Sequence, residues 1–457
     1  MASALQPFSA SPCLRVGCGQ GIIKGPVSQH SVGIDFGTTN TSIAIVHENG
    51  TLQLGQFPFL GKLTDAYRSL LYFEQVRDKP PAPPTTFCWT GPQGIEHYLA
   101  ADSQGRLIQS LKSFLATRNM EGTQVFEKKR TIEELIGRIL ADVRAEASRQ
   151  FGVDIRHATV GRPVRFVGAD TVDDDNYAED RLADAFNLAG FDTIAFEFEP
   201  VAAAHEYQSR LDHDELILIG DFGGGTSDFS LVRVGPTILH QGRTDRDLLG
   251  NAGVGIAGDA FDAQIIRHLV SPALGSKSKF RSMEKLLPLP AWPYSGLERW
   301  HQLSFLKTSE VIEQLERIKA QALEAEMIGY LIHLIKYDLG YQLHRSVQKL
   351  KNELSSWSSS EFEFADGDLV LRATVERNEF EEWIEYELDQ ISTCIDTLLA
   401  KTGVDAKSVD AVFLTGGTSF VPAVRRIFDQ QFGAAKIRSG HEFTSVAMGL
   451  ARQAATR

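Results

Sequence analysis

The chain contains 457 residues, of which 46 are Lys or Arg and 59 are Asp or Glu, so its formal net charge is −13. This length exceeds what one small core holds, and we expect two or more lobes. A content of 43% hydrophobic and 23% charged residues excludes disorder of the whole chain. The negative net charge argues against general binding to nucleic acid or to anionic membranes. A pocket with local positive charge can still bind a nucleotide.

Four cysteines, Cys13, Cys18, Cys88 and Cys394, are too few and too scattered for a disulfide framework, which fits a reducing, cytoplasmic compartment. The pair Cys13 and Cys18 lacks a second Cys/His pair to complete a zinc site. No apolar run approaches the roughly 18 residues of a membrane-spanning helix. Residues 1–30 carry no acidic side chain and predict a disordered leader, with an organelle transit peptide as the alternative.

Two stretches share one strand–turn–strand pattern. Residues 31–46 (SVGIDFGTTNTSIAIV) and 215–234 (ELILIGDFGGGTSDFSLVRV) each predict a β-hairpin with a tip rich in Gly and hydroxyl side chains. Asp35 and Asp221 occupy the same place in each, 221 − 35 = 186 residues apart. This spacing is too long for a solenoid repeat but suits two related lobes. We therefore expect the two tips to face each other across a cleft between the lobes.

The residues between the hairpins predict alternating strands and helices. A capping box at Thr131 and Glu134 begins a helix with apolar residues at helical spacing, which Gly152 ends. The other elements expected here are a stiff proline-rich loop at 80–94, strands at 158–160 and 195–198, and a helix from Pro200.

An acidic segment at residues 170–180 has two interpretations. Its carboxylates are typical of a solvated helix N-terminus, where the helix dipole favours negative charge. A cation site is the alternative.

After the second hairpin the chain becomes largely helical over residues 264–346. Apolar residues recur at helical spacing from Val311 to Ala322 and from Ile328 to Ile335, and must be buried against the second lobe or against a partner. The remaining elements expected are a helix at 376–402 ended by Gly403, a strand at 411–414, a tight turn at 415–419, and a helix from Val421.

The two hairpin tips together predict one site. A glycine-rich turn can direct several backbone N–H groups at one anion, and Thr hydroxyls add donors for phosphate oxygens. Asp35 and Asp221 would repel phosphate directly, but they suit a hydrated Mg²⁺ that bridges phosphates. The pattern therefore predicts two phosphate loops that flank a metal ion.

Other nucleotide motifs do not fit. Residues 253–258 match G-x-G-x-x-G, but the residues before them do not predict a strand, so we interpret them as a turn before a helix at 261–269. The sequence has no Walker A motif, and its Asp-Phe-Gly triplets lack the companion motifs of protein kinases.

Four segments, in order, resemble motifs of the seventy-kilodalton heat-shock (DnaK-type) chaperones of the actin-like ATPase superfamily, most closely the short YegD-type chaperone-like proteins. They are two phosphate motifs at 34–40 and 221–228, a connecting segment at 198–204, and an adenosine loop at 414–419. The resemblance implies an α/β, two-lobed actin-like ATPase fold, with duplicated lobes around a nucleotide cleft. The lobes would be residues 31–214 and 215–457, the second with a helical insertion at 264–346.

The resemblance also implies roles. Lys112 would position the attacking water and neutralise γ-phosphate charge, and Glu199 would help orient water on the metal. Asp221, supported by Thr226, would accept the water's proton, and Asp35 and Asp221 would order the waters around Mg²⁺. Thr38 and Thr39 would contact the β- and γ-phosphates. The full nucleotide-binding set implied is Gly37, Thr38, Thr39, Asn40, Gly223, Gly224, Gly225, Gly258, Lys351, Ser355, Gly416, Gly417, Thr418 and Phe420.

The adenosine end departs from the family. Gln348 replaces a Glu, Phe420 replaces an adenine-stacking Arg, and a late Asp falls at or near Phe443. Phe420 could stack on the base or turn into the core, and the sequence leaves both open. Only eight residues follow Gly449, so the peptide-binding domain of the family is not expected.

The function implied is Mg²⁺-dependent binding and slow hydrolysis of ATP to ADP by a chaperone-like protein. Its partners would be client proteins and a co-chaperone or exchange factor, with no nucleic acid and no membrane. We expect the insertion to gate nucleotide exchange or to dock a partner. The alternatives are a nucleotide-gated scaffold or assembly protein, and a small-molecule kinase of the same superfamily.

Overall fold

The computed structural model describes residues 31–59, 61–76, 84–101, 105–208, 211–241, 247–282, 284–298, 306–439 and 444–456. The predictions about a leader at 1–30, the pair Cys13 and Cys18, and Phe443 lie outside these residues.

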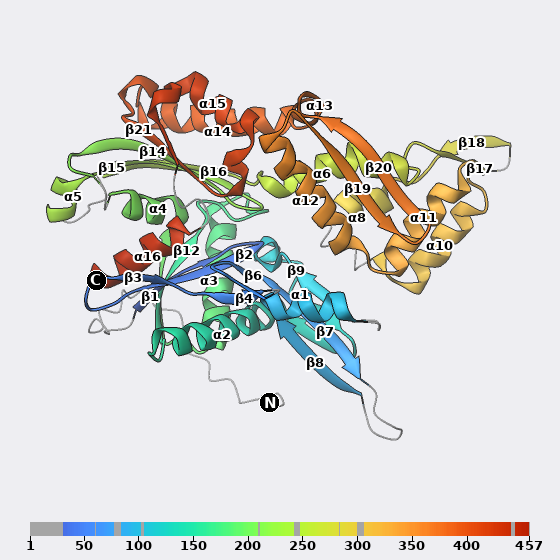
Figure 1. The fold of residues 1–457 in the computed structure, drawn as a ribbon, viewed down its shortest axis with the longest axis horizontal. Helices are drawn as coiled ribbons and strands as arrows, with labels where there is room; N and C mark the ends of the chain where they lie inside the picture. Colours follow the sequence, from blue (N-terminus) through green and yellow to red (C-terminus); the bar gives the residue numbers. More distant parts are fainter. Residues whose placement is uncertain are drawn as a thin grey trace.

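The fold consists of two lobes whose central sheets share one topology (Figure 1). In each sheet the first three strands form an antiparallel meander. A later strand pairs in parallel with the first strand of the meander, and a last strand pairs in parallel with that one. The first sheet contains, in order, β3 (Leu52–Leu54), β2 (Asn40–Val46), β1 (Ser31–Phe36), β12 (His157–Arg162) and β13 (Thr193–Phe198), and the short β6 (Tyr67–Arg68) also pairs with β2. The second contains β16 (Leu248–Val254), β15 (Ser227–Val234), β14 (Glu215–Phe222), β21 (Ala411–Thr415) and β22 (Ile437–Ser439). The predicted duplicated, two-lobed α/β fold is confirmed.

The two predicted hairpins form the centre of each sheet. Asp35 pairs with Ser42 across β1 and β2, and Asp221 pairs with Asp228 across β14 and β15, so the registers are equivalent. The alternating apolar residues of these strands are buried on both faces, which is typical of central strands covered by helices. This register places both tips at corresponding ends of the two sheets.

Helices α2 (Ile132–Phe151) and α3 (Val172–Leu188) pack together against the first sheet. The predicted capping box at Thr131 is present, and Gly152 ends α2 in the left-handed conformation at φ +71°. The acidic segment is the N-terminus of α3, as favoured, with a second capping box between Thr171 and Asp174.

Two helices cross between the lobes. Helix α4 (Glu199–Gln208), which begins at the predicted connecting segment, packs on β14 and β15, whereas the last helix, α16 (Ser445–Thr456), packs on β1, β2 and α4. A Cβ added at Gly449 would lie 1.7 Å from the carbonyl oxygen of Ala202, so the two helices meet almost backbone to backbone. The expected boundary at 214 and 215 therefore divides the sheets, while α16 returns to the first-lobe sheet (Figure 1).

The outer part of the first lobe is a three-stranded sheet covered by a helix. The stiff loop expected at 80–94 is wrong for residues 85–94, because the chain there forms a strand and begins a helix. Residues 85–90 pair antiparallel with residues 71–76, a long-range contact that the local proline content does not indicate. The elements are β4 (Phe57–Phe59), β5 (Lys62–Thr64), β6 (Tyr67–Arg68), β7 (Leu70–Val76), β8 (Thr85–Thr90), α1 (Gly91–Ala100), β9 (Arg106–Gln109), β10 (Gly122–Val125) and β11 (Lys128–Thr131).

The outer part of the second lobe is mostly helical, and the predicted apolar stripes join the core of that lobe. Leu315, Ile328, Leu331 and Ile335 are buried there beside Phe261. The segment also holds a hairpin, β17 and β18, which helical periodicity did not predict. Its elements are α5 (Pro236–Gln241), α6 (Gly258–Ile265), α7 (Ser271–Ala273), β17 (Lys279–Ser282), β18 (Lys285–Pro288), α8 (Trp292–Glu298), α10 (Ser309–Lys319), α11 (Ala325–Lys336), α12 (Gly340–Ser356), β19 (Ser359–Asp366) and β20 (Leu369–Glu376).

The helix expected at 376–402 is interrupted. It forms α13 (Arg377–Trp383) and α14 (Glu385–Thr402), with Ile384 between them at φ −99° and ψ 11°. Ile384 is fully buried, which fixes the offset between the two segments. The turn after β21 and the helix α15 (Pro422–Phe432) follow as predicted, and Gly403 ends α14 at φ +68°.

Candidate functional site

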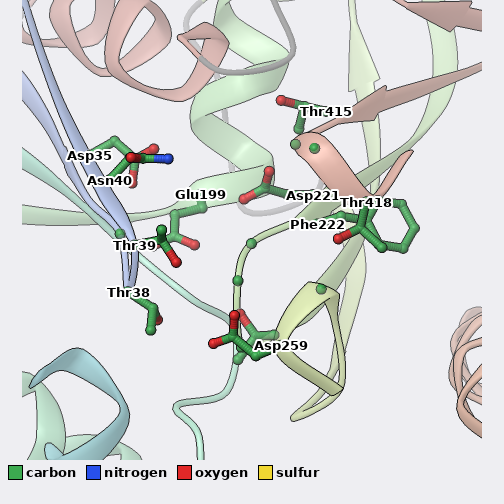
Figure 2. Close-up of a pocket in the computed structure, with 18 of the residues that line it drawn as sticks. Asp35, Thr38, Thr39, Asn40, Glu199, Asp221, Phe222, Asp259, Thr415 and Thr418 are labelled. Carbon is green, nitrogen blue, oxygen red and sulfur yellow. The ribbon is translucent and has the colours of Figure 1, made fainter. Parts of the chain in front are cut away.

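A cavity of about 570 Å³ lies between the lobes, and it has the size of a small-molecule site. Each residue that the sequence placed in the site lines this cavity, from Asp35 and Lys112 in the first lobe to Phe420 in the second. Figure 2 shows Thr38, Thr39 and Asp35 on one side and Asp221, Thr415 and Thr418 on the other. The fold therefore brings together residues that lie up to 385 positions apart in the sequence (420 − 35).

Both hairpin tips are tight turns of the same kind. The N–H of Gly37 donates to the carbonyl oxygen of Asn40, and the N–H of Gly223 donates to that of Thr226, each at 2.9 Å. The tips also approach each other, since a Cβ added at Gly224 would lie 2.8 Å from the Oγ1 of Thr39. Two glycine-rich turns thus line one cavity, and successive backbone N–H groups of such turns can form an anion-binding site.

The turn after β21 completes this wall of the cavity. Gly416 has φ +85°, and a Cβ there would lie 2.0 Å from the carbonyl oxygen of Phe222. Glycine is therefore required by both the dihedral angle and the close approach of two chains. The contact holds the loop of Gly416, Gly417 and Thr418 against the base of the second tip.

Lys112 forms a buried ion pair with Glu199. Its Nζ lies 2.6 Å from Oε1 of Glu199, and both side chains are less than a tenth exposed. Ser110, two residues before Lys112, is buried and has a left-handed backbone conformation at φ +56°. For a residue other than glycine this conformation costs ~1–2 kcal/mol. Strained backbone of this kind collects at functional sites, here where the chain directs a lysine into the cavity.

Charges at this end of the cavity perturb one another. Burial works against the charge of Lys112, but the carboxylates of Glu199 and Asp35 outweigh it and raise its pKa. Burial, with repulsion from Glu199, raises the pKa of Asp35 to about 7 and the pKa of Asp221 well above its ordinary value. Groups with such pKa values cluster at catalytic sites.

Asp228, which the sequence analysis did not place in the site, lies directly behind it. The residue is fully buried, and its Oδ1 accepts hydrogen bonds from the N–H of Val164 at 2.8 Å and of Arg165 at 3.4 Å. Burial and Glu199 raise the pKa of Asp228 to about 7. Its position opposite Asp221 in the hairpin, equivalent to Ser42 opposite Asp35, was readable from the sequence.

The other end of the cavity is formed by helices α6 and α12. Nζ of Lys351 lies 2.6 Å from Oδ1 of the buried Asp262 and donates to the carbonyl oxygen of Gly258 at 3.0 Å. Ser355 lies one turn further along α12, where its Oγ donates to the carbonyl oxygen of Lys351. Phe420 is 41% exposed and faces the cavity, so the alternative that it turns into the core is wrong.

The sequence analysis missed several lining residues, among them Ser42, Arg68, Asp259, Asn352 and Thr415. Asp259 follows Gly258 directly, so its position at the start of α6 was available from the motif. Arg68 had no local signal, because its position depends on pairing between strands far apart in sequence.

The residues at the phosphate end fit a magnesium ion held through water. The donors are hydroxyl and carboxylate oxygens, which Mg²⁺ prefers. In the described part of the chain no three His, Cys, Asp or Glu side chains lie close enough to hold a metal ion directly. This also leaves the alternative of a cation site at the acidic segment without a ligand cluster; Asp173 and Asp174 there bind Arg118 instead.

Residues 110–284 and 336–457 match a family model described as "Hsp70 protein". The chain belongs to the Hsp70 family. This confirms the resemblance to DnaK-type proteins that the four motifs carry. Residues 1–109 and 285–335 lie outside the match, and the second of these stretches falls within the predicted insertion.

Two curated relatives of this Hsp70 chain align with most of it at low sequence identity. The chain is 24% identical over 451 residues to the stromal 70 kDa heat shock-related protein of chloroplasts from Pisum sativum. This alignment covers 94% of the chain and 53% of the relative. It is 22% identical over 434 residues to the chaperone protein DnaK of Thermosipho melanesiensis, which covers 93% and 59%. The chain therefore spans little more than half the length of these relatives. None of the helices in the described ranges is both long and apolar enough to cross a membrane.

Proposed function

We propose that this Hsp70-family chain binds ATP with Mg²⁺ in the interlobe cavity and hydrolyses it slowly, as a chaperone-like protein. The observation that carries the proposal is the convergence of both hairpin tips and the Lys112–Glu199 ion pair on one cavity. Donors fixed in advance around a phosphate chain are the main means by which proteins catalyse phosphoryl transfer.

The phosphate end would bind the nucleotide's charge. Backbone N–H groups of both tips, with the hydroxyls of Thr38 and Thr39, would donate to the β- and γ-phosphates. Lys112 would neutralise γ-phosphate charge, and its bond to Glu199 fixes its Nζ in place. Mg²⁺, held through waters by Asp35 and Asp221, would supply further charge neutralisation when bound.

Hydrolysis needs a proton acceptor for the attacking water. As the water oxygen bonds to the γ-phosphorus and the bond to the β–γ bridging oxygen breaks, a proton must leave the water. Asp221 is the acceptor we favour, since burial and neighbouring carboxylates raise its pKa and so make it a better base. Glu199 would orient water, and the Thr226 hydroxyl, buried at the second tip, would support it.

The adenosine end would hold the base and ribose. Lys351 and Ser355 on α12 would contact the ribose, while Phe420 and the Gly416-Gly417-Thr418 loop would contact adenine. Client proteins and an exchange factor are the partners we propose from family membership, with residues 264–346 as the segment that gates exchange or docks one of them.

Four measurements test the function. Release of inorganic phosphate from ATP, with Mg²⁺ and then with EDTA, should show slow turnover that requires the metal. A panel of metabolites that acquired the γ-phosphate would instead identify a small-molecule kinase. Sedimentation that changed with ATP in the absence of turnover would favour a nucleotide-gated scaffold. Failure to bind either ATP or ADP in calorimetry would overturn the proposal.

A further inference from the structure

Arg68 differs from the other cations that line the cavity. Lys112 and Lys351 each lie 2.6 Å from a buried carboxylate, of Glu199 and Asp262 respectively. Among the described residues, no carboxylate oxygen lies within 4.0 Å of the Arg68 guanidinium. The cavity therefore contains a positive charge whose formal counter-ion is not supplied by the part of the chain that the structure describes.

The position of Arg68 is fixed by strand pairing. Strand β6 pairs with β2, and in this register Arg68 lies directly opposite Asn40 at the end of the first tip. Its Nη1 donates to Oδ1 of Asn40 at 3.0 Å, and the N–H of the next residue, Ser69, donates to the carbonyl oxygen of Thr39 at 2.9 Å. The guanidinium is thus held beside the same turn that we propose as a phosphate loop.

The bond to Asn40 uses only part of what the guanidinium can donate. Arginine has five N–H donors in a fixed planar fork and stays charged in proteins. Burial lowers the pKa of Arg68, and the carboxylate of Asp259 across the cleft counteracts this. A half-buried cation with unused donors, facing a cavity, is a binding site for an anion.

We propose that Arg68 binds the phosphate chain of the nucleotide, beside the first tip, and so selects nucleoside di- and triphosphates over nucleosides. This inference rests on the proposed function, because it takes the cavity to be the nucleotide site. Phosphate is the chemistry that fits, since a planar fork can donate two parallel hydrogen bonds to phosphate oxygens. A lobe-closing ion pair with Asp259 is the competing role, and the two roles predict different ligand dependence.

The test uses the full chain and two variants. Arg68→Gln removes the charge but keeps an amide that can donate to Asn40, whereas Arg68→Lys keeps the charge without the fork. Isothermal titration calorimetry with adenosine, ADP and ATP then separates phosphate contacts from base contacts. The matched control is Arg149→Gln, an exposed arginine on α2 that pairs with Glu146 and does not line the cavity.

We expect Arg68→Gln to weaken ATP and ADP roughly tenfold or more, the loss of one charge-assisted contact, while adenosine affinity stays within about twofold. Arg68→Lys should recover part of the loss, and the Arg149 variant should bind as the wild type does. Equal weakening of all three ligands would assign Arg68 to closure of the lobes and overturn the inference. Unchanged affinities would overturn it as well, with the proposed function intact. A wild-type chain that binds none of the three ligands would overturn both.

If Arg68→Gln fails to fold by circular dichroism, the same comparison is made with Arg68→Lys alone. Loss of the bidentate fork should then weaken ADP and ATP but not adenosine, and a uniform change would count against the inference.

Discussion

The two ends of the cavity recognise a ligand by different means. The phosphate end consists of backbone turns, in which Gly37 and Gly223 close equivalent hydrogen bonds and Gly224 approaches Thr39. The other end consists of side chains on a helix, where Lys351 and Ser355 project from α12. Backbone recognition tolerates few residue types, because a Cβ at Gly37 would lie 2.4 Å from the carbonyl oxygen of Asn40 and one at Gly224 would lie 2.8 Å from the Oγ1 of Thr39.

Side-chain recognition, by contrast, can change one residue at a time. The departures from the family gather at this second end, at Gln348 and Phe420, which both line the cavity. We therefore expect the phosphate end to behave as in other family members, whereas base selectivity should be particular to this chain.

The largest effect is expected at the phosphate end, for Lys112→Ala. Hydrolysis should fall by roughly a hundredfold or more, the cost of losing one key stabiliser of developing charge, while ATP binding is retained. Single-turnover phosphate release measures the rate, and calorimetry measures binding. The control is Lys129→Ala, an exposed lysine paired with Glu121 at the surface. Turnover like that of the wild type in the Lys112 variant would contradict its catalytic role.

At the adenosine end, Phe420→Ala should weaken ATP by roughly tenfold. Stacking of a base on an aromatic ring is worth about 1–3 kcal/mol, and about 1.4 kcal/mol corresponds to a factor of ten. Because a phenyl ring offers no hydrogen bond to the base, GTP should bind nearly as well as ATP in the wild type. The control Phe420→Tyr keeps the ring and should bind normally. Equal affinities for the alanine variant, with its fold intact, would remove Phe420 from the site.

A third prediction concerns how the two ends are held together. Tyr341 of α12 is buried in an apolar cluster of the first lobe with Leu70 and Tyr72, and the hydroxyl of Tyr98 donates to the carbonyl oxygen of Asp338 at 2.5 Å. Opening the cleft would expose this apolar surface, so the contact favours the closed state.

Tyr341→Ala should therefore speed release of a fluorescent ADP severalfold in stopped-flow experiments. The matched control is Tyr386→Ala, a tyrosine of α14 that is 66% exposed. A release rate equal to that of the wild type would mean that the cluster does not limit opening.

The sequence predicted the features that depend on local pattern. Both hairpins, the capping box at Thr131 and the turn at Gly416 follow from residues close together in the chain. It did not predict the interruption at Ile384, where apolar periodicity runs on through two segments that tertiary packing separates.

Long-range pairing accounts for the other omissions. Arg68 enters the cavity because β6 pairs with a strand 28 residues away, and α16 returns to the first-lobe sheet through small residues such as Ala447 and Ala451. Neither carries a signal in its own segment. The residues predicted for the site line one cavity because its glycines and acids lie in the turns themselves.

The smallest effect is expected on the pH dependence of stability in the metal-free protein, because ionisation of the buried carboxylates at the phosphate end destabilises the folded state. Burial and Glu199 raise the pKa of Asp228 to about 7, from an ordinary value of 3.8. Between these values the folded state binds a proton at Asp228 that the unfolded state has lost. Stability therefore falls as pH rises from about 4 to about 7, and Asp228 adds no further change above that.

Asp228→Asn removes this titration, and its amide oxygen can still accept from the N–H of Val164, which Asp228 binds at 2.8 Å. Thermal midpoints measured in EDTA between pH 5 and 8 should decline less steeply for the variant than for the wild type, by a few degrees over the range. Asp368→Asn, on an exposed turn, controls for the loss of one negative charge. If the thermal midpoints of Asp228→Asn and the wild type change with pH in parallel, the Asp228 carboxylate is ionised over the whole range. The positive charge of Lys112 would then stabilise the ionised carboxylate more than burial destabilises it.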